Sequence, residues 1–269
     1  MSGAEERPDD CPAWFFGEIL LSLHELDEIC VTVKFLGTRG NIPIQSPRHR
    51  WHSAMLLSGR KGRVLIDCGE DWLGRIDRLR PTAILVTHGH PDHAGGLKRG
   101  AACPVYATAA TWQIMARWPV GVRCQLPLQR PVMIGGFVTE AWPVQHSLNA
   151  PAVGFKICTS DGCLFYAPDV AALDRPKRTL QSVDLYVGDG AVLVRSLVRS
   201  RGPVLTGHAS VATQLDWCRS GGVARAIFTH CGSGVVRSAP SRVEEVVRSL
   251  GRVRGVDASL AHDGLTIRL

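Results

Sequence analysis

The sequence predicts a mixed α/β fold in which two β-sheets pack together between helices, and three observations support this. Short apolar, β-branched runs recur along the chain, and each ends in residues that stop a strand, such as Gly, Pro, Asp or His. Some runs follow one another closely, as in hairpins, whereas others are separated by helical patterns, as in βα units. At 269 residues, 45% of them hydrophobic, the chain is long enough to bury a substantial core.

The predicted elements begin at residue 31. Strands are expected near 31–36, 53–58 and 63–67, with a helix near 71–79 and a strand over 83–86. Later strands are expected near 104–107, 137–144, 153–158 and 162–166. The second half continues with strands near 184–187, 203–206, 225–229 and 264–268, and with helices near 209–219 and 240–250. The chain thus divides into a domain of residues 31–269 and an N-terminal extension of residues 1–30.

The N-terminal extension is predicted to be helical. Residues 1–10 are polar and acidic, and residues 14–31 mix apolar side chains with charged ones. Because charges interrupt the apolar stretches and no basic segment or small-residue cleavage site accompanies them, we expect neither a membrane span nor a signal peptide. A helix packed on the domain is the simplest interpretation, and a partner-binding helix is the alternative.

Composition indicates the environment and the partners. The net charge is +7 and the sequence pI is near 9.1, which favours anionic partners. Aromatic residues make up 6% of the chain and do not alternate with basic ones, so we expect no stacking platform for a long single strand. Nine scattered cysteines without a CxxC pair predict free thiols in a cytoplasmic protein.

The most informative segment has the order His-x-His-x-Asp-His and comes directly after the apolar run Ala83–Val86. His88 and His90 are two residues apart, so an extended backbone would direct both to one side, while Asp92 and His93 follow toward a helix. Neutral imidazoles with carboxylates suit zinc and, less selectively, manganese or iron. Two adjacent ions can activate a water and bind a leaving oxygen. A histidine-rich surface turn is the alternative, but the ordered spacing favours a two-metal site.

In this segment the chain resembles the metallo-β-lactamase superfamily, whose defining motif is His-x-His-x-Asp-His after a strand. The family also carries an early Asp, a lone His, a bridging Asp and a last His, each at a strand end. This sequence has them in the same order, as Asp67, His146, Asp169 and His230. The resemblance covers about residues 33–269. It implies a four-layer αββα sandwich with a dinuclear metal site.

The resemblance also implies which residues hold the metals. One ion would be bound by His88, His90 and His146. The second would be bound by Asp92, His93 and His230, with Asp169 bridging the two. A hydroxide between the metals would be the nucleophile. Asp92 is expected to be a catalytic residue as well as a ligand. Zinc is the expected metal, and manganese is the alternative.

Asp67 is expected behind the ligands, where its carboxylate would accept a proton from a ligand imidazole and fix its tautomer. An Asp that only forms a turn is the alternative. Cys68 and Cys231 adjoin Asp67 and His230 in sequence. Because neighbouring side chains along a strand point in opposite directions, we expect both thiols to pack away from the metals.

Four features outside the metal motif bear on the branch of the superfamily. Phe35–Gly40 looks like the opening of tRNase Z and of phosphoribosyl cyclic phosphate phosphodiesterases, with glycines that permit a tight turn. Arg50 and His52 lie on a basic loop that could contact a substrate phosphate, or that could simply be solvated. His208 occupies the place of a histidine that stands near the scissile phosphate in phosphodiesterase branches, which implies a general acid or a phosphate donor. Asp189 could orient it, although helix capping and a turn are the alternatives for these two residues.

Together with the C-terminal segment Ala261–Ile267, these features most resemble the cyclic phosphate phosphodiesterase group related to tRNase Z. We therefore expect a metal-dependent phosphodiesterase acting on a cyclic phosphate or another small anionic phosphodiester. A nuclease or RNA 3′-end processing enzyme of the tRNase Z type is the alternative, although the segment from His146 to Asp169 leaves no room for a long tRNA-gripping arm.

Two further alternatives remain. A lactonase or thioesterase would use the same metal ligands, but a neutral ester has no need of His208 and the basic loop. A non-catalytic relative is disfavoured because the ligand set is complete. A homodimer is implied by the resemblance alone, and nucleic acid is a partner that the sequence permits but does not require.

Overall fold

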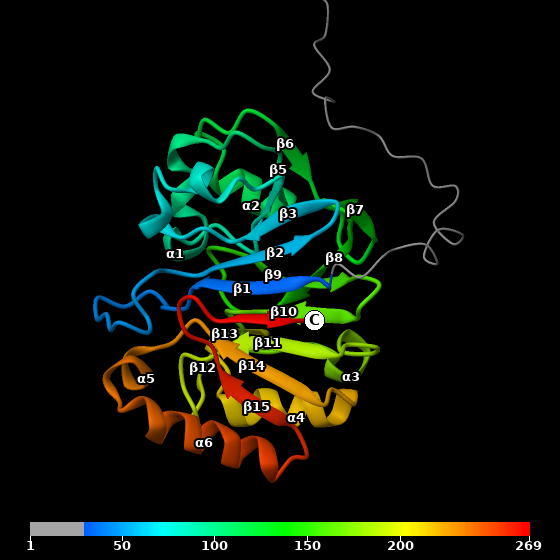
Figure 1. Cartoon of the computed structure of the whole chain (residues 1–269). Helices are drawn as coiled ribbons and strands as arrows, with labels where there is room; N and C mark the ends of the chain where they lie inside the picture. The colour runs from blue at the N-terminus through cyan, green and yellow to red at the C-terminus, as the bar shows by residue number, and fades with distance from the viewer. Residues whose placement is uncertain (1–29) are drawn as a thin grey trace, which may run out of the picture.

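The computed structural model describes residues 30–269, so the predicted helix of the N-terminal extension lies outside the described residues. Two seven-stranded sheets pack face to face, with helices on both outer faces (Figure 1). The apolar layer between the sheets includes Phe35 and Ile66 from the first sheet and Phe155 and Val187 from the second. This arrangement confirms the predicted four-layer αββα sandwich.

The first sheet has the strand order β16-β1-β2-β3-β4-β5-β6. Its strands β16, β1, β2 and β3 pair antiparallel, and β3 to β6 pair parallel. The bounds are β1 (Thr32–Gly37), β2 (Ala54–Gly59), β3 (Gly62–Ile66), β4 (Ala83–Leu85), β5 (Val105–Ala107), β6 (Arg123–Gln125) and β16 (Thr266–Arg268).

The second sheet has the order β15-β14-β11-β10-β9-β8-β7, in which β10, β11, β14 and β15 are parallel. The bounds are β7 (Val132–Ile134), β8 (Phe137–Val144), β9 (Ala152–Cys158), β10 (Cys163–Tyr166), β11 (Leu185–Asp189), β14 (Arg225–Thr229) and β15 (Asp257–Leu260). A separate hairpin is formed by β12 (Leu197–Arg201) and β13 (Val204–His208). Every residue of β11 is buried, as expected for a central parallel strand.

The α-helices cover the outer faces of the sheets. Their bounds are α1 (Pro91–Ala94), α2 (Ala109–Ile114), α3 (Pro176–Thr179), α4 (Val211–Gly221), α5 (Ser233–Arg237) and α6 (Pro240–Arg252). The two longest, α4 and α6, lie along the second sheet (Figure 1) and bury Leu215 and Val247 against it. Helix α4 begins at the N-cap Ser210, whose Oγ accepts a hydrogen bond from the Thr213 amide, and ends at Gly222 with a φ of 76°.

The prediction of one helix over residues 71–79 is wrong. The structure has two short 3₁₀ helices there, η1 (Glu70–Trp72) and η2 (Ile76–Leu79), and a third, η3 (Gly95–Arg99), follows α1. Gly74 separates the first two with a φ of 71°, a value that no α-helix can contain. Trp72 and Ile76 still pack against the first sheet, so the apolar periodicity indicated the buried face correctly but not the type of helix.

The prediction that the cysteines are free thiols is wrong for two of them. Cys158 ends β9 and Cys163 begins β10, and these residues lie opposite each other in the antiparallel pair and form a disulfide. The absence of a CxxC pair could not reveal a bond that depends on strand register. Cys68 and Cys231, which adjoin Asp67 and His230, are free thiols and are completely buried.

The parallel strands direct the predicted site residues to one end of the molecule. Asp67 follows β3, the His-x-His-x-Asp-His segment follows β4, Asp189 ends β11, and His230 follows β14. The carboxyl ends of parallel strands share an edge, so residues far apart in sequence converge there. Within residues 30–269, no helix is long and apolar enough to cross a membrane.

Candidate metal centre

The structure brings every predicted metal ligand into one cluster. Three overlapping groups each offer ligand atoms that lie within 4.8 Å of one another. The groups are His88, His90, His146 and Asp169; Asp92, His93, Asp169 and His230; and Asp169, Asp189, His208 and His230. Because Asp169 belongs to all three, it has the position required of a bridging ligand.

The local fold of the histidine motif explains its geometry. His88 and His90 follow β4 in an extended segment, and His90 is the N-cap residue of α1, with Pro91 in the first turn. Asp92 and His93 then lie in that turn. Gly89 is required between the two histidines, because a Cβ there would lie 2.7 Å from Cγ2 of Ile114 on α2.

The first ligand group presents ring nitrogens to one another. Nε2 of His88 lies 2.9 Å from Nδ1 of His90, which lies 3.3 Å from Nε2 of His146. Nε2 of His146 is also 3.1 Å from Oδ2 of Asp169. Burial lowers the pKa of both His88 and His146 to about 4. Both rings are therefore neutral at physiological pH, which is the form that binds a metal ion.

The second ligand group contains buried polar atoms without hydrogen-bond partners. Nε2 of His93 is one of them, and it lies 3.4 Å from Oδ2 of Asp92 and 3.4 Å from Oδ2 of Asp169. Oδ1 of Asp92 is a second atom without a partner, while Oδ2 of Asp92 lies 3.1 Å from Nε2 of His230. Unpaired buried polar atoms are costly, and a bound cation would satisfy them. The donor set thus fits two divalent metal ions.

Asp67 lies directly behind His93. Oδ2 of Asp67 is 2.8 Å from Nδ1 of His93, and its Oδ1 accepts hydrogen bonds from the amide and the hydroxyl of Thr87. With its proton on Nδ1, His93 donates to Asp67, while its Nε2 lies on the side of Asp92 and Asp169. Asp67 has a φ of 58°, which is tolerated because its side chain is held on both sides.

His208 and Asp189 lie at the edge of the same cluster. Nδ1 of His208 is 2.8 Å from Oδ2 of Asp189 and 2.9 Å from Oδ1 of Asp169. Burial alone would lower the pKa of His208, but these two carboxylates raise it to about 11. The side chain is 25% exposed, so its Nε2 is the atom that can face a substrate. The helix cap that was the alternative role belongs to Ser210.

The two predicted phosphate contacts have different surroundings. Arg50 is exposed, and its guanidinium lies over the Trp51 ring at 5.0 Å from the centroid. His52 is only 5% exposed, and its Nδ1 lies 2.9 Å from Oδ2 of Asp71. Burial and the neighbouring Arg39 lower the pKa of His52, so the ring is neutral. The structure therefore leaves Arg50 accessible but buries a neutral His52 beside Asp71.

Sequence reasoning missed Arg39, which holds this loop against the centre. Its side chain is 4% exposed, its Nη2 lies 2.6 Å from Oδ2 of Asp71, and its Nε donates to the carbonyl oxygen of Arg50. The adjoining Gly40 approaches a ligand, because a Cβ there would lie 3.0 Å from Cε1 of His230. The Thr-Arg-Gly run at residues 38–40 was the available signal, but only its glycines were used.

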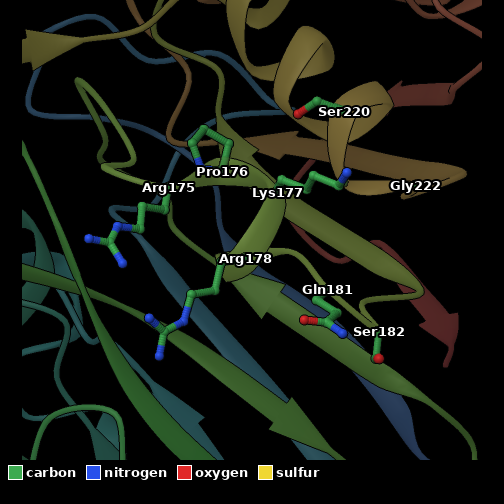
Figure 2. Close-up of a pocket in the computed structure, with 9 residues that line it drawn as sticks. Arg175, Pro176, Lys177, Arg178, Gln181, Ser182, Ser220 and Gly222 are labelled. Atoms are coloured by element: carbon green, nitrogen blue, oxygen red, sulfur yellow. The ribbon is translucent and has the colours of Figure 1, made fainter.

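A groove of about 700 Å³ lies away from the centre, between α3 and the end of α4 (Figure 2). Exposed side chains from both helices line it, among them Arg175, Lys177 and Arg178. None of the candidate ligands lines this groove.

Sequence comparisons find relatives named as metal-dependent hydrolases and as ribonucleases. An UPF0173 metal-dependent hydrolase of Pyrobaculum islandicum is 29% identical over 189 residues, which cover 62% of this chain and 78% of that protein. A ribonuclease Z of Bradyrhizobium diazoefficiens is 28% identical over 138 residues, which cover 42% of this chain and 45% of that protein.

Structural comparison agrees with the fold. A diphosphatase from the PhnP family superposes with a TM-score of 0.64 at 19% sequence identity, over 89% of this chain and 98% of that one. The model of the β-lactamase superfamily domain matches residues 62–231, a span that begins at β3 and ends just after His230. The chain therefore belongs to the β-lactamase superfamily.

Proposed function

We propose that this protein is a metal-dependent phosphodiesterase that hydrolyses a cyclic phosphate or another small anionic phosphodiester. One observation favours attack at a phosphorus atom over attack at a carbonyl carbon. The His208–Asp189 pair lies against Asp169, and the His208 ring is partly open to solvent. A protonated donor beside the metal cluster suits a negatively charged substrate whose leaving group departs as an alkoxide.

The candidate ligands would hold two divalent ions, with zinc expected and manganese as the alternative. When bound, such ions supply an activated water and neutralise charge that develops on the phosphoryl oxygens. Asp67 would keep His93 in the tautomer that presents Nε2 to the cluster. Arg50, which is exposed on the loop held by Arg39, is the residue available to attract the phosphate.

His208 would act through its Nε2–H. The raised pKa keeps the ring protonated at neutral pH, and Nδ1 is already engaged by Asp189 and Asp169. The remaining N–H can donate to a phosphate oxygen or protonate the leaving oxygen. Asp189 would hold the ring orientation, because its carboxylate accepts the Nδ1–H at 2.8 Å.

RNA processing is the second candidate, favoured by the similarity to a ribonuclease Z. The short connection between β9 and β10 does not form an extended arm between His146 and Asp169. A nuclease of this kind would therefore contact the end of an RNA close to the metal cluster.

The test compares three substrate classes on protein of known metal content. We expect metal-dependent hydrolysis of bis(p-nitrophenyl) phosphate, with little turnover of a lactone or a thioester. Turnover of the carbonyl substrates alone would overturn the phosphodiesterase proposal. If the phosphodiester is cleaved, 2′,3′-cyclic nucleotides and RNA ends are the next substrates, because they separate the small-molecule role from RNA processing.

A further inference from the structure

A buried glutamine on α4 joins the backbone of Asp189 to the backbone beside His208. Nε2 of Gln214 donates to the carbonyl oxygen of Asp189 at 2.7 Å and to that of Ala209 at 2.9 Å. Its Oε1 accepts from the Asp189 amide at 2.8 Å and from the Tyr186 hydroxyl at 2.9 Å. The amide therefore uses both of its donors and both acceptor lone pairs, although it is completely buried.

The surroundings of Gln214 fix this arrangement. Gln214 lies in the first turn of α4, where its own amide donates to the carbonyl oxygen of Ser210 at 3.0 Å. Gly188 provides the space for this arrangement, because a Cβ there would lie 2.3 Å from Cε1 of Tyr186 and 2.4 Å from Oε1 of Gln214. A glycine in the fully buried strand β11 is thus explained by the Tyr186 ring and the glutamine that pack against it.

Asp189 and His208 come from different parts of the fold. Asp189 ends β11 of the large sheet, whereas His208 ends β13 of the separate hairpin. The residue after His208 is held from two sides, since the Ala209 amide donates to the carbonyl oxygen of Val170 and its own carbonyl oxygen accepts from Gln214. The relative position of the two elements near the metal cluster therefore depends on hydrogen bonds.

We infer that Gln214 is a positioning residue for the His208–Asp189 pair. It holds the backbone of Asp189 and that of Ala209, the residue next to His208, on one side-chain amide. In this way it sets the direction of the His208 ring toward the leaving oxygen. This inference rests on the proposed function, in which His208 is the proton donor. A small displacement of a positioned group can lower a rate by a large factor, so a residue without substrate contact can affect the chemistry.

The test uses Gln214→Glu, which keeps the side-chain shape and the acceptor for the Asp189 amide but removes the two N–H donors. Two phosphodiesters serve as probes: bis(p-nitrophenyl) phosphate, with a good leaving group, and diphenyl phosphate, with a poorer one. We expect kcat on diphenyl phosphate to fall at least tenfold more than kcat on bis(p-nitrophenyl) phosphate. A difference of this size is expected when a proton donor is displaced, because the poorer leaving group depends more on protonation. Metal content, measured by atomic emission, should not change.

Tyr186→Phe is the matched control. It removes one hydrogen bond to the same buried amide but leaves in place the hydrogen bonds that join Gln214 to Asp189 and Asp189 to His208. We expect lower thermal stability and an unchanged ratio of the two rates. If Gln214→Glu does not fold, Gly188→Ala takes its place, because the added methyl displaces Oε1 of Gln214 without replacing the amide. The same methyl meets Cε1 of Tyr186, so its effect on the ratio of the two rates is compared with that of Tyr186→Phe.

The outcomes separate this inference from the proposed function. Equal losses on both probes in the Gln214 or Gly188 variant, with His208→Ala still selective for the poorer leaving group, would overturn the positioning role alone. If His208→Ala itself affects both probes equally, the proton-donor role fails and the positioning role fails with it.

Discussion

Nδ1 of His93 lies 2.8 Å from Oδ2 of Asp67, and both side chains are completely buried. This contact orients the only ring nitrogen of His93 that can reach the metal cluster. We expect Asp67→Ala to lower metal affinity by roughly 10- to 100-fold, the usual effect of removing a partner behind a ligand. Competition with a chromogenic chelator measures the affinity, and an unchanged value would show that Asp67 only forms a turn.

Asp169 is the residue shared by the three ligand groups. We expect Asp169→Ala to lose both metals, because neither ion keeps a complete set of ligands. His146→Ala should instead weaken only one, since His146 belongs to a single group. Metal stoichiometry after dialysis checks this difference. Full metal content in Asp169→Ala would contradict the bridging assignment.

His208 should matter most where the leaving oxygen is basic. We expect His208→Ala to reduce turnover of phosphodiesters with poor leaving groups by roughly 10²-fold or more, within the range for a lost general acid, and to affect good leaving groups far less. Metal content should stay intact, because His208 belongs to neither of the two groups proposed to hold the ions. Loss of metal would identify it as a ligand instead.

His49 makes stability depend on pH. Burial lowers the pKa of His49 to about 4, with smaller contributions from Arg48 and His262, whereas the unfolded chain titrates near 6.5. The unfolded state therefore binds more protons between these values, and stability falls as the pH drops from 6.5 toward 4. The loss is on the order of 3 kcal/mol at most. Urea unfolding of metal-free protein should show a weaker pH dependence in His49→Asn, and identical profiles would exclude this role.

The disulfide can be tested by counting thiols. The chain has nine cysteines, and we expect reduction to raise the number that react with a thiol reagent in denaturant by two, because Cys158 and Cys163 are bonded. The pair closes a short loop, so its reduction should lower the free energy of unfolding by about 2 kcal/mol. Nine reactive thiols without a reductant would contradict the disulfide in the isolated protein.

The metal cluster could be predicted from sequence because its ligands lie at strand ends. An apolar run followed by His or Asp indicates both the strand and the edge at which the side chain emerges, so Asp169 and His230 could be placed despite their distance from His88. The fold class followed from the same runs. Burial of every residue in β11 explains why it appears as a continuous apolar stretch rather than an alternating one.

The features that sequence could not supply depend on contacts between distant segments. Gln214 looks like any polar residue of an amphipathic helix, and its role emerges only when α4 lies over β11. Arg39 and His52 have ordinary local sequences, yet both meet Asp71 in the folded chain. The Cys158–Cys163 bond required the strand register. Such residues act through tertiary geometry, which leaves no periodic pattern.

The measurement that tests the central claim most directly is a metal titration of metal-free protein, followed by hydrolysis of bis(p-nitrophenyl) phosphate. We expect no activity before metal is added and a plateau at two zinc or manganese ions per chain. The Asp169→Ala protein should stay inactive at every metal concentration. Phosphodiester turnover that is the same before and after metal removal would contradict a reaction at this cluster.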